Sequence, residues 1–245
     1  MYQYLIGTGI MACIWAPLFL FRKDLRKVMV WSGVFYIILL SIGFVAYRLL
    51  AHDVTRSITP GYWAPPTLFN LGQITHGYGI EDALFMFFGG GIASVLYEFI
   101  TRKKLGESGL PKPKKRVALG IGILGALIFH ALFYLNDMYV LIAFNLLGAM
   151  ALLWFRRDLL AHSLISGVAF MVVYILAFML FNSVFPDFIN QYYNLLATSG
   201  LSPLGVPLEE YLYGITFGML WGPLYAFAHG LKASKRYVPA GSLAK

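Results

Sequence analysis

Charge is scarce in this sequence. Only 12% of its residues are Asp, Glu, Lys or Arg, whereas soluble globular proteins carry about 25%. Hydrophobic residues make up 59% of the chain, so the composition excludes an ordinary water-soluble domain and indicates a membrane protein. One bundle fits the length of 245 residues better than several domains.

Cysteine is almost absent as well. The single Cys13 lies in an apolar stretch, which excludes a disulfide within the chain. The N-terminus lacks a basic region and a small-residue cleavage site, so we expect its first apolar stretch to be a retained helix rather than a signal peptide.

Long apolar stretches dominate what remains. A bilayer core of roughly 30 Å needs about 20 apolar residues per helix. Strands are excluded from these stretches, because a lipid-exposed sheet would leave its edge groups unpaired. We therefore expect an all-α membrane protein with seven transmembrane helices, at Tyr4–Phe21, Val28–Leu50, Ile80–Ile100, Val117–Leu135, Met138–Phe155, Leu159–Phe185 and Leu208–Leu231.

The basic residues are sorted by these helices. All of the 19 Lys and Arg except Arg48 and Arg56 fall after the first, third, fifth or seventh helix. Cytoplasmic loops carry such an excess. The pattern predicts a multi-pass protein of the plasma membrane, with its N-terminus outside and its C-terminus in the cytoplasm. The net charge of +8 then needs no nucleic-acid partner.

The sequence also repeats itself. Residues 21–25 (FRKDL) recur as residues 155–159 (FRRDL), and residues 32–34 (SGV) recur as 166–168, both 134 positions later. Residues 77–85 (GYGIEDALF) match 205–213 (GVPLEEYLY), 128 positions later. The difference of six residues falls in an outer loop, where deletions are tolerated.

This repetition predicts two parallel three-helix repeats joined by a linker helix. We place the first repeat at residues 1–101, the basic loop and linker helix at 102–135, the second repeat at 136–231 and a basic tail at 232–245. Parallel repeats imply a pseudo-twofold axis along the membrane normal, and repeat interfaces are common substrate sites. A homo-oligomer in the lipid bilayer is compatible with this layout.

Three familiar site types are set aside. The glycines at 120, 122 and 125 fit a dinucleotide fingerprint, which needs a strand before it; inside a membrane helix they favour close helix packing instead. No Lys lies within a predicted helix, as a retinal Schiff base would require. The five histidines show no metal-ligand spacing, so we predict no metal.

Two acidic doublets remain, Glu81-Asp82 and Glu209-Glu210, each at the outer start of a helix. Acids there are stabilised by the helix dipole, by about 0.3–1 kcal/mol each, and Pro207 suits a helix start. Two doublets at equivalent places, among only 11 acids, favour function over capping. Carboxylates in or near the membrane are costly and usually functional.

Physical chemistry suggests what such a cluster does. Like charges brought together cannot all ionise, so one carboxyl stays protonated. That acid can donate a proton to an electron-rich substrate, and a neighbour can take one back. Aromatic faces stabilise a developing cation, although such rings also simply pack a bundle. The aromatic residues predicted to bind substrate are Phe85, Phe88, Tyr213, Phe217 and Trp221.

The segment from Pro207 to Tyr213 resembles the P-x-E-[E/D] signature of the small membrane lycopene cyclases. The resemblance implies acids that drive redox-neutral ring closure at the ends of a linear carotenoid such as lycopene, without flavin or another cofactor. It assigns Pro207, Glu209 and Glu210 in the second repeat, and Glu81 and Asp82 in the first. Gly79 stands where the first repeat would have proline.

We therefore predict a carotenoid cyclase, an intramolecular lyase or isomerase, with Glu209 and Glu81 as the first choice for catalysis. Two alternatives stay open at this stage. One is a carotenoid hydratase that traps the same cation with water. The other is a small proton-coupled transporter or lipid-binding protein. The scarcity of polar residues within the helices weakens this alternative; Asn145, Asn182 and Thr216 are among the few.

Overall fold

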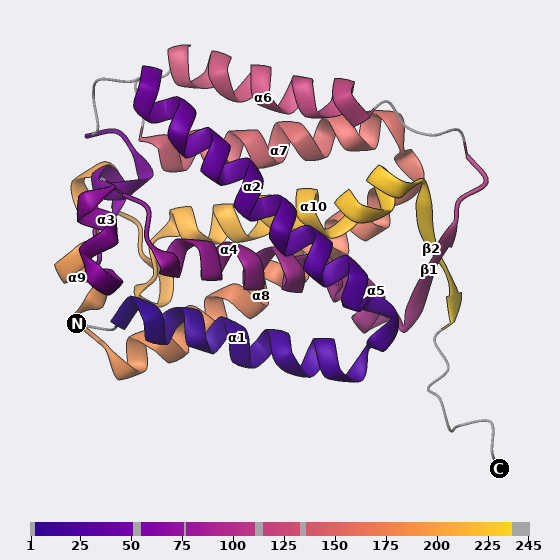
Figure 1. The fold of residues 1–245 in the computed structure, drawn as a ribbon, viewed down its shortest axis with the longest axis horizontal. Helices are drawn as coiled ribbons and strands as arrows, with labels where there is room; N and C mark the ends of the chain where they lie inside the picture. Colours follow the sequence, from indigo (N-terminus) through magenta and orange to yellow (C-terminus); the bar gives the residue numbers. More distant parts are fainter. Residues whose placement is uncertain (1–2, 51–54, 76, 111–114, 133–135, 237–245) are drawn as a thin grey trace.

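Helices dominate the structure, a computed structural model that describes residues 3–50, 55–75, 77–110, 115–132 and 136–236 (Figure 1). The end of the fourth expected helix, residues 133–135, and the tail from residue 237 lie outside this part. The elements are α1 (Gln3–Phe21), α2 (Arg26–Leu50), α3 (Leu71–Ile74), α4 (Ile80–Ala93), α5 (Leu96–Thr101), β1 (Lys103–Glu107), α6 (Lys115–Leu132), α7 (Asp137–Phe155), α8 (Leu160–Val184), α9 (Phe188–Tyr192), α10 (Leu208–His229) and β2 (Leu231–Arg236).

Each of the seven apolar stretches is mostly helical where the structure describes it. Within that part of the chain, five spans are long and apolar enough to cross a membrane: Gln3–Phe21, Lys23–Val45, Ile80–Thr101, Asp137–Phe155 and Arg157–Val184. In α6 the apolar helix Leu119–His130 is shorter. The central helix α10 is not among the five; most of its side chains are buried by protein, so it does not need a long lipid-facing surface.

The third stretch differs from the single helix expected at Ile80–Ile100. It is divided into α4 and α5, because Val95 leaves the helical conformation (φ −130°, ψ −4°). The hydroxyl of Ser94 donates a hydrogen bond of 2.9 Å to the carbonyl of Gly91 at this break. The apolar run itself gave no sign of the interruption.

Two short strands correct the expectation of a purely helical chain. β1 follows α5 and β2 follows α10, and they pair antiparallel with a bulge between Lys104 and Leu105. β1 lies outside the apolar stretches, β2 begins at the last residue of the seventh, Leu231, and both lie at the right-hand end of the bundle in Figure 1. The strands therefore join the segments that follow the two acidic helices.

The helices pack as two similar groups. α4 packs on α1 and α2, while α10 packs on α7 and α8, and α6 covers α7. α4 and α10 contact each other and run through the middle of the bundle (Figure 1). The two acidic helices are thus the central element of each group.

Matching arginines make matching contacts in the two groups. Arg22 forms two hydrogen bonds to Asp24 and one to the carbonyl of Lys103. Arg156 forms two to Asp158 and one to the carbonyl of Leu231. The planar guanidinium holds a carboxylate with two bonds and still donates a third. Lys103 and Leu231 are themselves 128 positions apart, as the repeat requires.

Glycines let the central helices approach their neighbours. A Cβ on Gly33 of α2 would lie 2.5 Å from the carbonyl oxygen of Phe87, and one on Gly167 of α8 would lie 2.9 Å from that of Ile215. Glycines at helix contacts allow this close approach. In α6, a Cβ on Gly125 would lie 2.6 Å from the side chain of Leu147 of α7, and one on Gly122 would lie 3.4 Å from the Cα of Gly148, as the helix-packing interpretation predicts for these two glycines; one on Gly120 would meet no atom within 4 Å.

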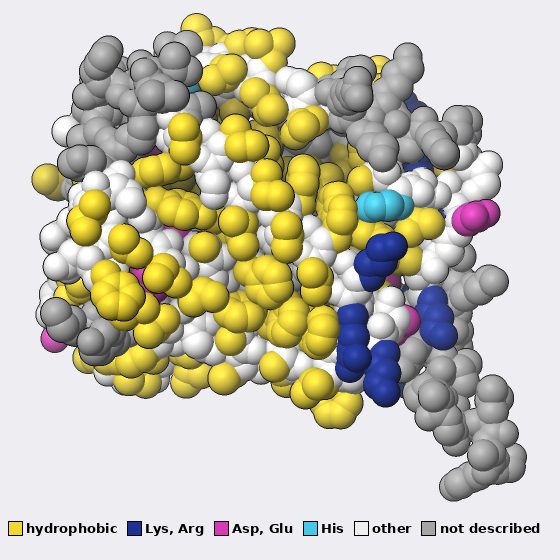
Figure 2. Space-filling model, in the orientation of Figure 1, with side chains coloured by type: hydrophobic (Ala, Val, Ile, Leu, Met, Phe, Trp, Pro, Cys, Tyr) yellow, Lys and Arg dark blue, Asp and Glu magenta, His cyan; other side chains and the backbone are white. Residues whose placement is uncertain are grey.

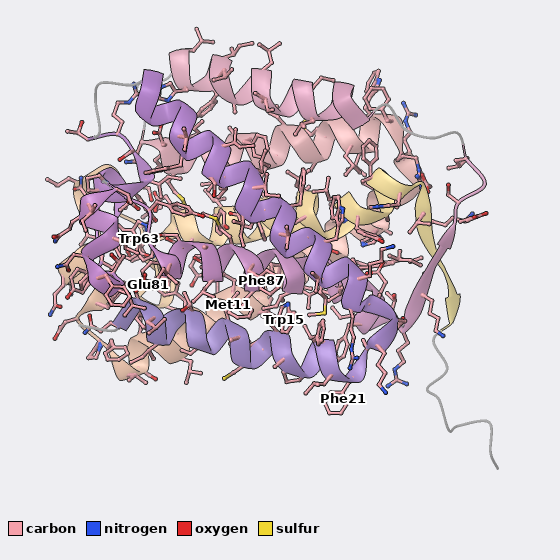
Figure 3. All side chains as sticks on the ribbon, in the orientation of Figure 1. Met11, Trp15, Phe21, Trp63, Glu81 and Phe87 are labelled. Carbon is pink, nitrogen blue, oxygen red and sulfur yellow. The ribbon has the colours of Figure 1, made fainter. Side chains whose placement is uncertain are left out.

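The surface separates by chemical type. Figure 2 shows hydrophobic side chains over most of the face in view and Lys and Arg side chains gathered at the end that holds β1 and β2. Phe21 projects from that end, whereas Trp63 and Glu81 lie towards the opposite end (Figure 3). Between them, Trp15 reaches from α1 towards Phe87 of α4, with ring centroids 5.6 Å apart.

Candidate active site

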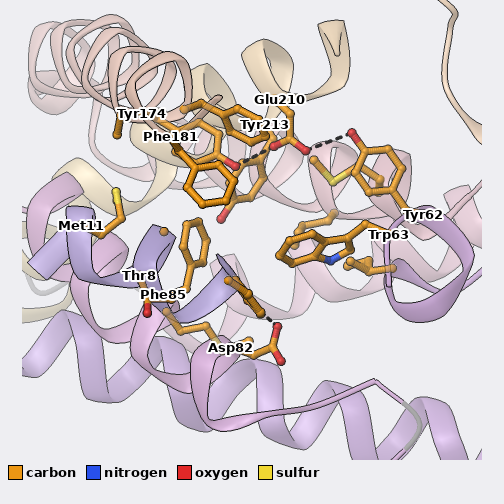
Figure 4. Close-up of a pocket in the computed structure, with 18 of the residues that line it drawn as sticks. Thr8, Met11, Tyr62, Trp63, Asp82, Phe85, Tyr174, Phe181, Glu210 and Tyr213 are labelled. Carbon is orange, nitrogen blue, oxygen red and sulfur yellow. Dashed lines mark hydrogen bonds between the residues drawn. The ribbon is translucent and has the colours of Figure 1, made fainter. Parts of the chain in front are cut away.

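A cavity of about 170 Å³ lies at the end of the bundle away from the strands. Its wall is formed by α1, α2, α4, α7, α8, α9 and α10, together with the loop that precedes α3 and Tyr193 after α9. Most of the lining is aromatic or aliphatic, and two carboxyl groups interrupt it, those of Asp82 and Glu210. Figure 4 shows them on opposite sides of the cavity, with rings between them.

Glu210 is buried and held by three phenols. One carboxyl oxygen, Oε1, accepts hydrogen bonds from Tyr62 (3.0 Å) and Tyr193 (3.2 Å). The other, Oε2, accepts one of 2.6 Å from Tyr174. Three donors compensate much of the cost of burying this carboxylate and fix its orientation towards the cavity.

These phenols are themselves held in the neutral form. Burial and the adjacent Glu210 carboxyl raise the pKa of Tyr62 well above the ordinary value of a phenol. The same causes raise the pKa of Tyr193. Both side chains therefore keep their protons and remain hydrogen-bond donors to Glu210.

Asp82 has a second task besides facing the cavity. Its Oδ2 accepts the backbone N–H of Gly79 (2.7 Å), which caps the start of α4. Its Oδ1 accepts a hydrogen bond of 2.7 Å from Tyr4 of α1. The capping interpretation of the doublets thus holds for Oδ2 of Asp82. Its Oδ1 accepts a hydrogen bond from a tyrosine, as both carboxyl oxygens of Glu210 do.

This geometry explains why the first repeat has Gly79 at the position where the second repeat has Pro207. Pro207 occupies the same place before α10 and has no N–H, so Glu210 has nothing to cap there. Gly79 does have an N–H and gives it to Asp82. A Cβ on Gly79 would also lie 2.9 Å from both Glu81 and Thr67. Glycine in one copy and proline in the other therefore leave the two second acids with different partners.

The first acids, Glu81 and Glu209, do not line the cavity. Both are buried, and both accept a hydrogen bond from a loop backbone, Glu81 from the N–H of Leu68 (2.7 Å) and Glu209 from that of Ser199 (2.6 Å). Tyr139 also donates to Glu209. In each of the two acids the second oxygen, Oε2, has no hydrogen-bond partner. The first acids thus fix the outer loops, and the second acids face the cavity.

The five aromatic residues expected at the site are divided in the same way. Phe85 and Tyr213 line the cavity. Phe217 is fully buried beneath it and stacks on Trp221, with ring centroids 5.4 Å apart. Phe88 packs against Trp15, and Trp221 lines a second cavity between α2, α6, α7 and α10.

The sequence did not predict the tyrosines that donate hydrogen bonds to Asp82 and Glu210, which are Tyr4, Tyr62, Tyr174 and Tyr193. They come from α1, α8 and two outer segments, and no regular spacing relates them to the acids. The sequence offered one general indication of these tyrosines. A buried carboxyl needs hydrogen-bond donors, and the chain has 16 tyrosines that could supply them.

Metal ligands are not grouped in the part of the chain that the structure describes: no three His, Cys, Asp or Glu side chains there are placed to hold an ion. One buried acid–base pair does lie at the strand end. Glu98 and His162 approach within 3.5 Å, and Tyr97 stacks on the imidazole. This pair is remote from the cavity lining.

Comparison with known proteins links part of the chain to a family. Residues 136–228 match the family model described as lycopene cyclase. This segment is similar to the lycopene cyclase family. The match includes Pro207, Glu209 and Glu210, and it lies within the second of the two expected repeats. No curated protein and no solved structure matches the chain.

The lycopene cyclase match bears on function at the level of the family. It supports an enzyme of carotenoid biosynthesis with a carotenoid substrate. The apolar helices are those of a membrane protein, which suits a substrate that dissolves in lipid. The comparison gives no support to the hydratase or to the transporter.

Proposed function

We propose that the protein is a carotenoid cyclase that closes rings at the ends of a linear carotenoid such as lycopene, without net redox change. One observation carries the proposal: corresponding acids of two central helices, Asp82 and Glu210, face a single aromatic cavity. The lycopene cyclase match over residues 136–228 supports the same reaction.

The reaction needs one proton donor and one proton acceptor. Protonation of the terminal carbon–carbon double bond creates a cation, the next double bond attacks it to form the ring, and loss of a proton restores a double bond. One proton is given and one is taken, so the product is an isomer. Carboxyl groups perform both steps when one is protonated and the other ionised.

The contacts suggest which acid takes which role. Glu210 accepts three hydrogen bonds and Asp82 accepts two, so the hydrogen bonds favour the ionised form more strongly at Glu210. We therefore assign Glu210 to stabilising the cation and accepting the proton, and Asp82 to donating it. Glu81 and Glu209 would position the outer loops around the substrate, because each binds a loop N–H.

The apolar wall explains why ring closure would be preferred to hydration. Water would trap the cation as an alcohol, but most of the cavity lining is hydrocarbon. Phe85 and Tyr213 offer aromatic faces to the cation in place of water. A volume of about 170 Å³ suits one end group rather than a whole carotenoid.

The proposal includes the architecture expected from the sequence: seven transmembrane helices in two parallel repeats, at residues 1–101 and 136–231, with a linker helix between them. The matching contacts of Arg22 and Arg156 support the repeats. The basic end seen in Figure 2 supports a cytoplasmic position for the strands and the C-terminus in the plasma membrane.

The test is pigment analysis in bacterial cells that make lycopene. Cells expressing the wild-type protein should convert lycopene into cyclic carotenoids, separated by chromatography. Glu210→Gln keeps the size of the side chain but removes its charge, so conversion should fall at least about 100-fold, within the range general acid–base groups contribute. Unchanged lycopene beside well-inserted wild-type protein would refute the proposal.

A matched control uses an acid outside the cavity. Glu107 lies exposed in β1, so Glu107→Gln should leave the pigments unchanged. Glu209→Gln separates the two acids of the doublet: it should reduce conversion less than Glu210→Gln does. The opposite order would return the catalytic role to Glu209.

A further inference from the structure

The second cavity, of about 270 Å³, lies between α2, α6, α7 and α10. Its wall is almost entirely apolar and rich in rings, among them Trp31, Phe35, Phe144, Trp221 and Phe227. Nothing in the proposed ring closure uses this space. Its chemistry suits an uncharged hydrocarbon rather than a polar ligand.

The two cavities lie next to each other along the same helices. On α2, Tyr36 and Leu40 line the first cavity, while Phe35 and Leu39 line the second. Tyr36 packs directly on Trp221, with ring centroids 4.5 Å apart. An aromatic contact therefore separates the two spaces.

Together the cavities extend along most of the bundle. On α10 they reach from Glu210 to His229, a distance of about 29 Å at the helical rise of about 1.5 Å per residue. The hydrocarbon core of a bilayer measures roughly 30 Å. The combined length is that of an extended chain lying parallel to the helices.

Small residues and loose packing leave room for such a chain. Gly122 of α6 and Gly148 of α7 form part of the second wall. Few of the described residues of α2 lie close to α7, although both helices line the two cavities. The space between α2 and α7 is therefore not filled by side chains that pack one helix directly on the other.

We infer that the second cavity holds the remainder of the same linear substrate whose end group lies between Asp82 and Glu210. This inference rests on the proposed function. The substrate would then lie along α2 and α10, across the membrane rather than within one leaflet. The chemical class is a long, uncharged polyene, because the residues that line the second cavity include no Lys or Arg to bind a lipid headgroup and His229 is their one titratable side chain.

The experiment compares a long and a short substrate with the same acyclic end group: lycopene and an apocarotenoid cut near its middle. Ala228→Phe and Leu119→Trp fill the second cavity from α10 and from α6. Each should lower lycopene cyclisation at least tenfold in membranes while changing apocarotenoid cyclisation less than twofold. Ala161→Phe adds a similar ring on the exposed face of α8 and should change neither.

Pigment retained by the purified protein gives an independent measurement. The wild-type protein should retain lycopene, and both filling variants should retain at least tenfold less. That result without any cyclisation would uphold the cavity assignment and refute the cyclase. Equal cyclisation of both substrates by both variants would refute the second cavity as the polyene site and leave the cyclase standing.

Discussion

Asp82 and Glu210 occupy corresponding positions 128 residues apart, and their carboxyl groups face the same cavity. Their surroundings are not equivalent, because Asp82 caps a helix and Glu210 is held by phenols alone. A repeated sequence has thus produced two acids with different partners. Such a difference is what a reaction with one proton donor and one acceptor requires.

The two oxygens of Glu210 should differ in their sensitivity to mutation. Tyr174→Phe leaves Oε2 without a partner, whereas Tyr62→Phe leaves Oε1 bonded to Tyr193. An unsatisfied buried group costs about 1–3 kcal/mol, so Tyr174→Phe should lower the free energy of unfolding more. Denaturation in detergent measures this. Tyr211→Phe, which removes an exposed hydroxyl, is the control; equal losses in all three variants would contradict the arrangement.

Alkaline pH should destabilise the protein through the tyrosines of the cavity. The raised pKa values of Tyr62 and Tyr193 mean that the unfolded chain loses these protons first. The contribution of these two tyrosines to stability should therefore be constant below about pH 10 and fall as the pH rises above it. Thermal unfolding at a series of pH values tests this. The fall should be shallower in Tyr62→Phe and in Tyr193→Phe; a slope that neither substitution alters would contradict the prediction.

Restoring the proline signature in the first repeat should be harmful. Gly79→Pro removes the N–H that Asp82 accepts and brings ring atoms against Glu81 and Thr67. We expect the free energy of unfolding in detergent to fall by about 1–3 kcal/mol and the conversion of lycopene to fall markedly. Pro207→Gly removes no hydrogen bond and should cost less. A Gly79→Pro protein as stable and active as the wild type would show that the capping bond has no importance.

The glycine contacts predict a simple comparison. Gly33→Ala and Gly218→Ala place a methyl group 2.5 Å and 2.4 Å from backbone carbonyls of neighbouring helices. Overpacking of this kind costs about 1–3 kcal/mol. Gly9→Ala meets no atom within 4 Å and should be neutral or slightly stabilising, because alanine favours helix. Thermal stability in detergent measures all three, and a destabilised Gly9→Ala beside a stable Gly33→Ala would reverse the assignment.

Chemical labelling tests the orientation. With Cys13 replaced by serine, Ser202→Cys should react with a membrane-impermeant maleimide on intact cells, because the 198–206 loop is expected outside. Lys23→Cys, exposed in the turn between α1 and α2, should react only after the membrane is opened. The reverse pattern would invert the predicted topology.

Much of the fold was predictable because it depends on local patterns. The apolar lengths identified the helices, and the spacing of 134 and then 128 residues located the equivalent Arg22 and Arg156. The acidic doublets were found for the same reason. The pairing of β1 with β2 was not, since it joins segments far apart in the sequence. The break at Val95 was not either, because the apolar run continues through it.

The candidate site was predictable only in part. Helical geometry places adjacent acids about 100° apart, so one acid of each doublet had to differ from its neighbour in direction. Which one faces the cavity depends on how α4 and α10 rotate against their neighbours, and close contacts such as those of Gly33 and Gly167 set that rotation. The phenols around Glu210 come from three separate segments, and no sequence period connects them.

The pairing of β1 with β2 has a consequence for chain continuity. β1 follows the helices of the first group and β2 follows those of the second. The one two-stranded sheet therefore forms only when the two groups are together. The described part of the connection from Ser108 to Asn136 contributes α6 to the bundle. A chain cut in that connection would therefore still carry one strand on each fragment, and complementary edges would guide the two fragments back together.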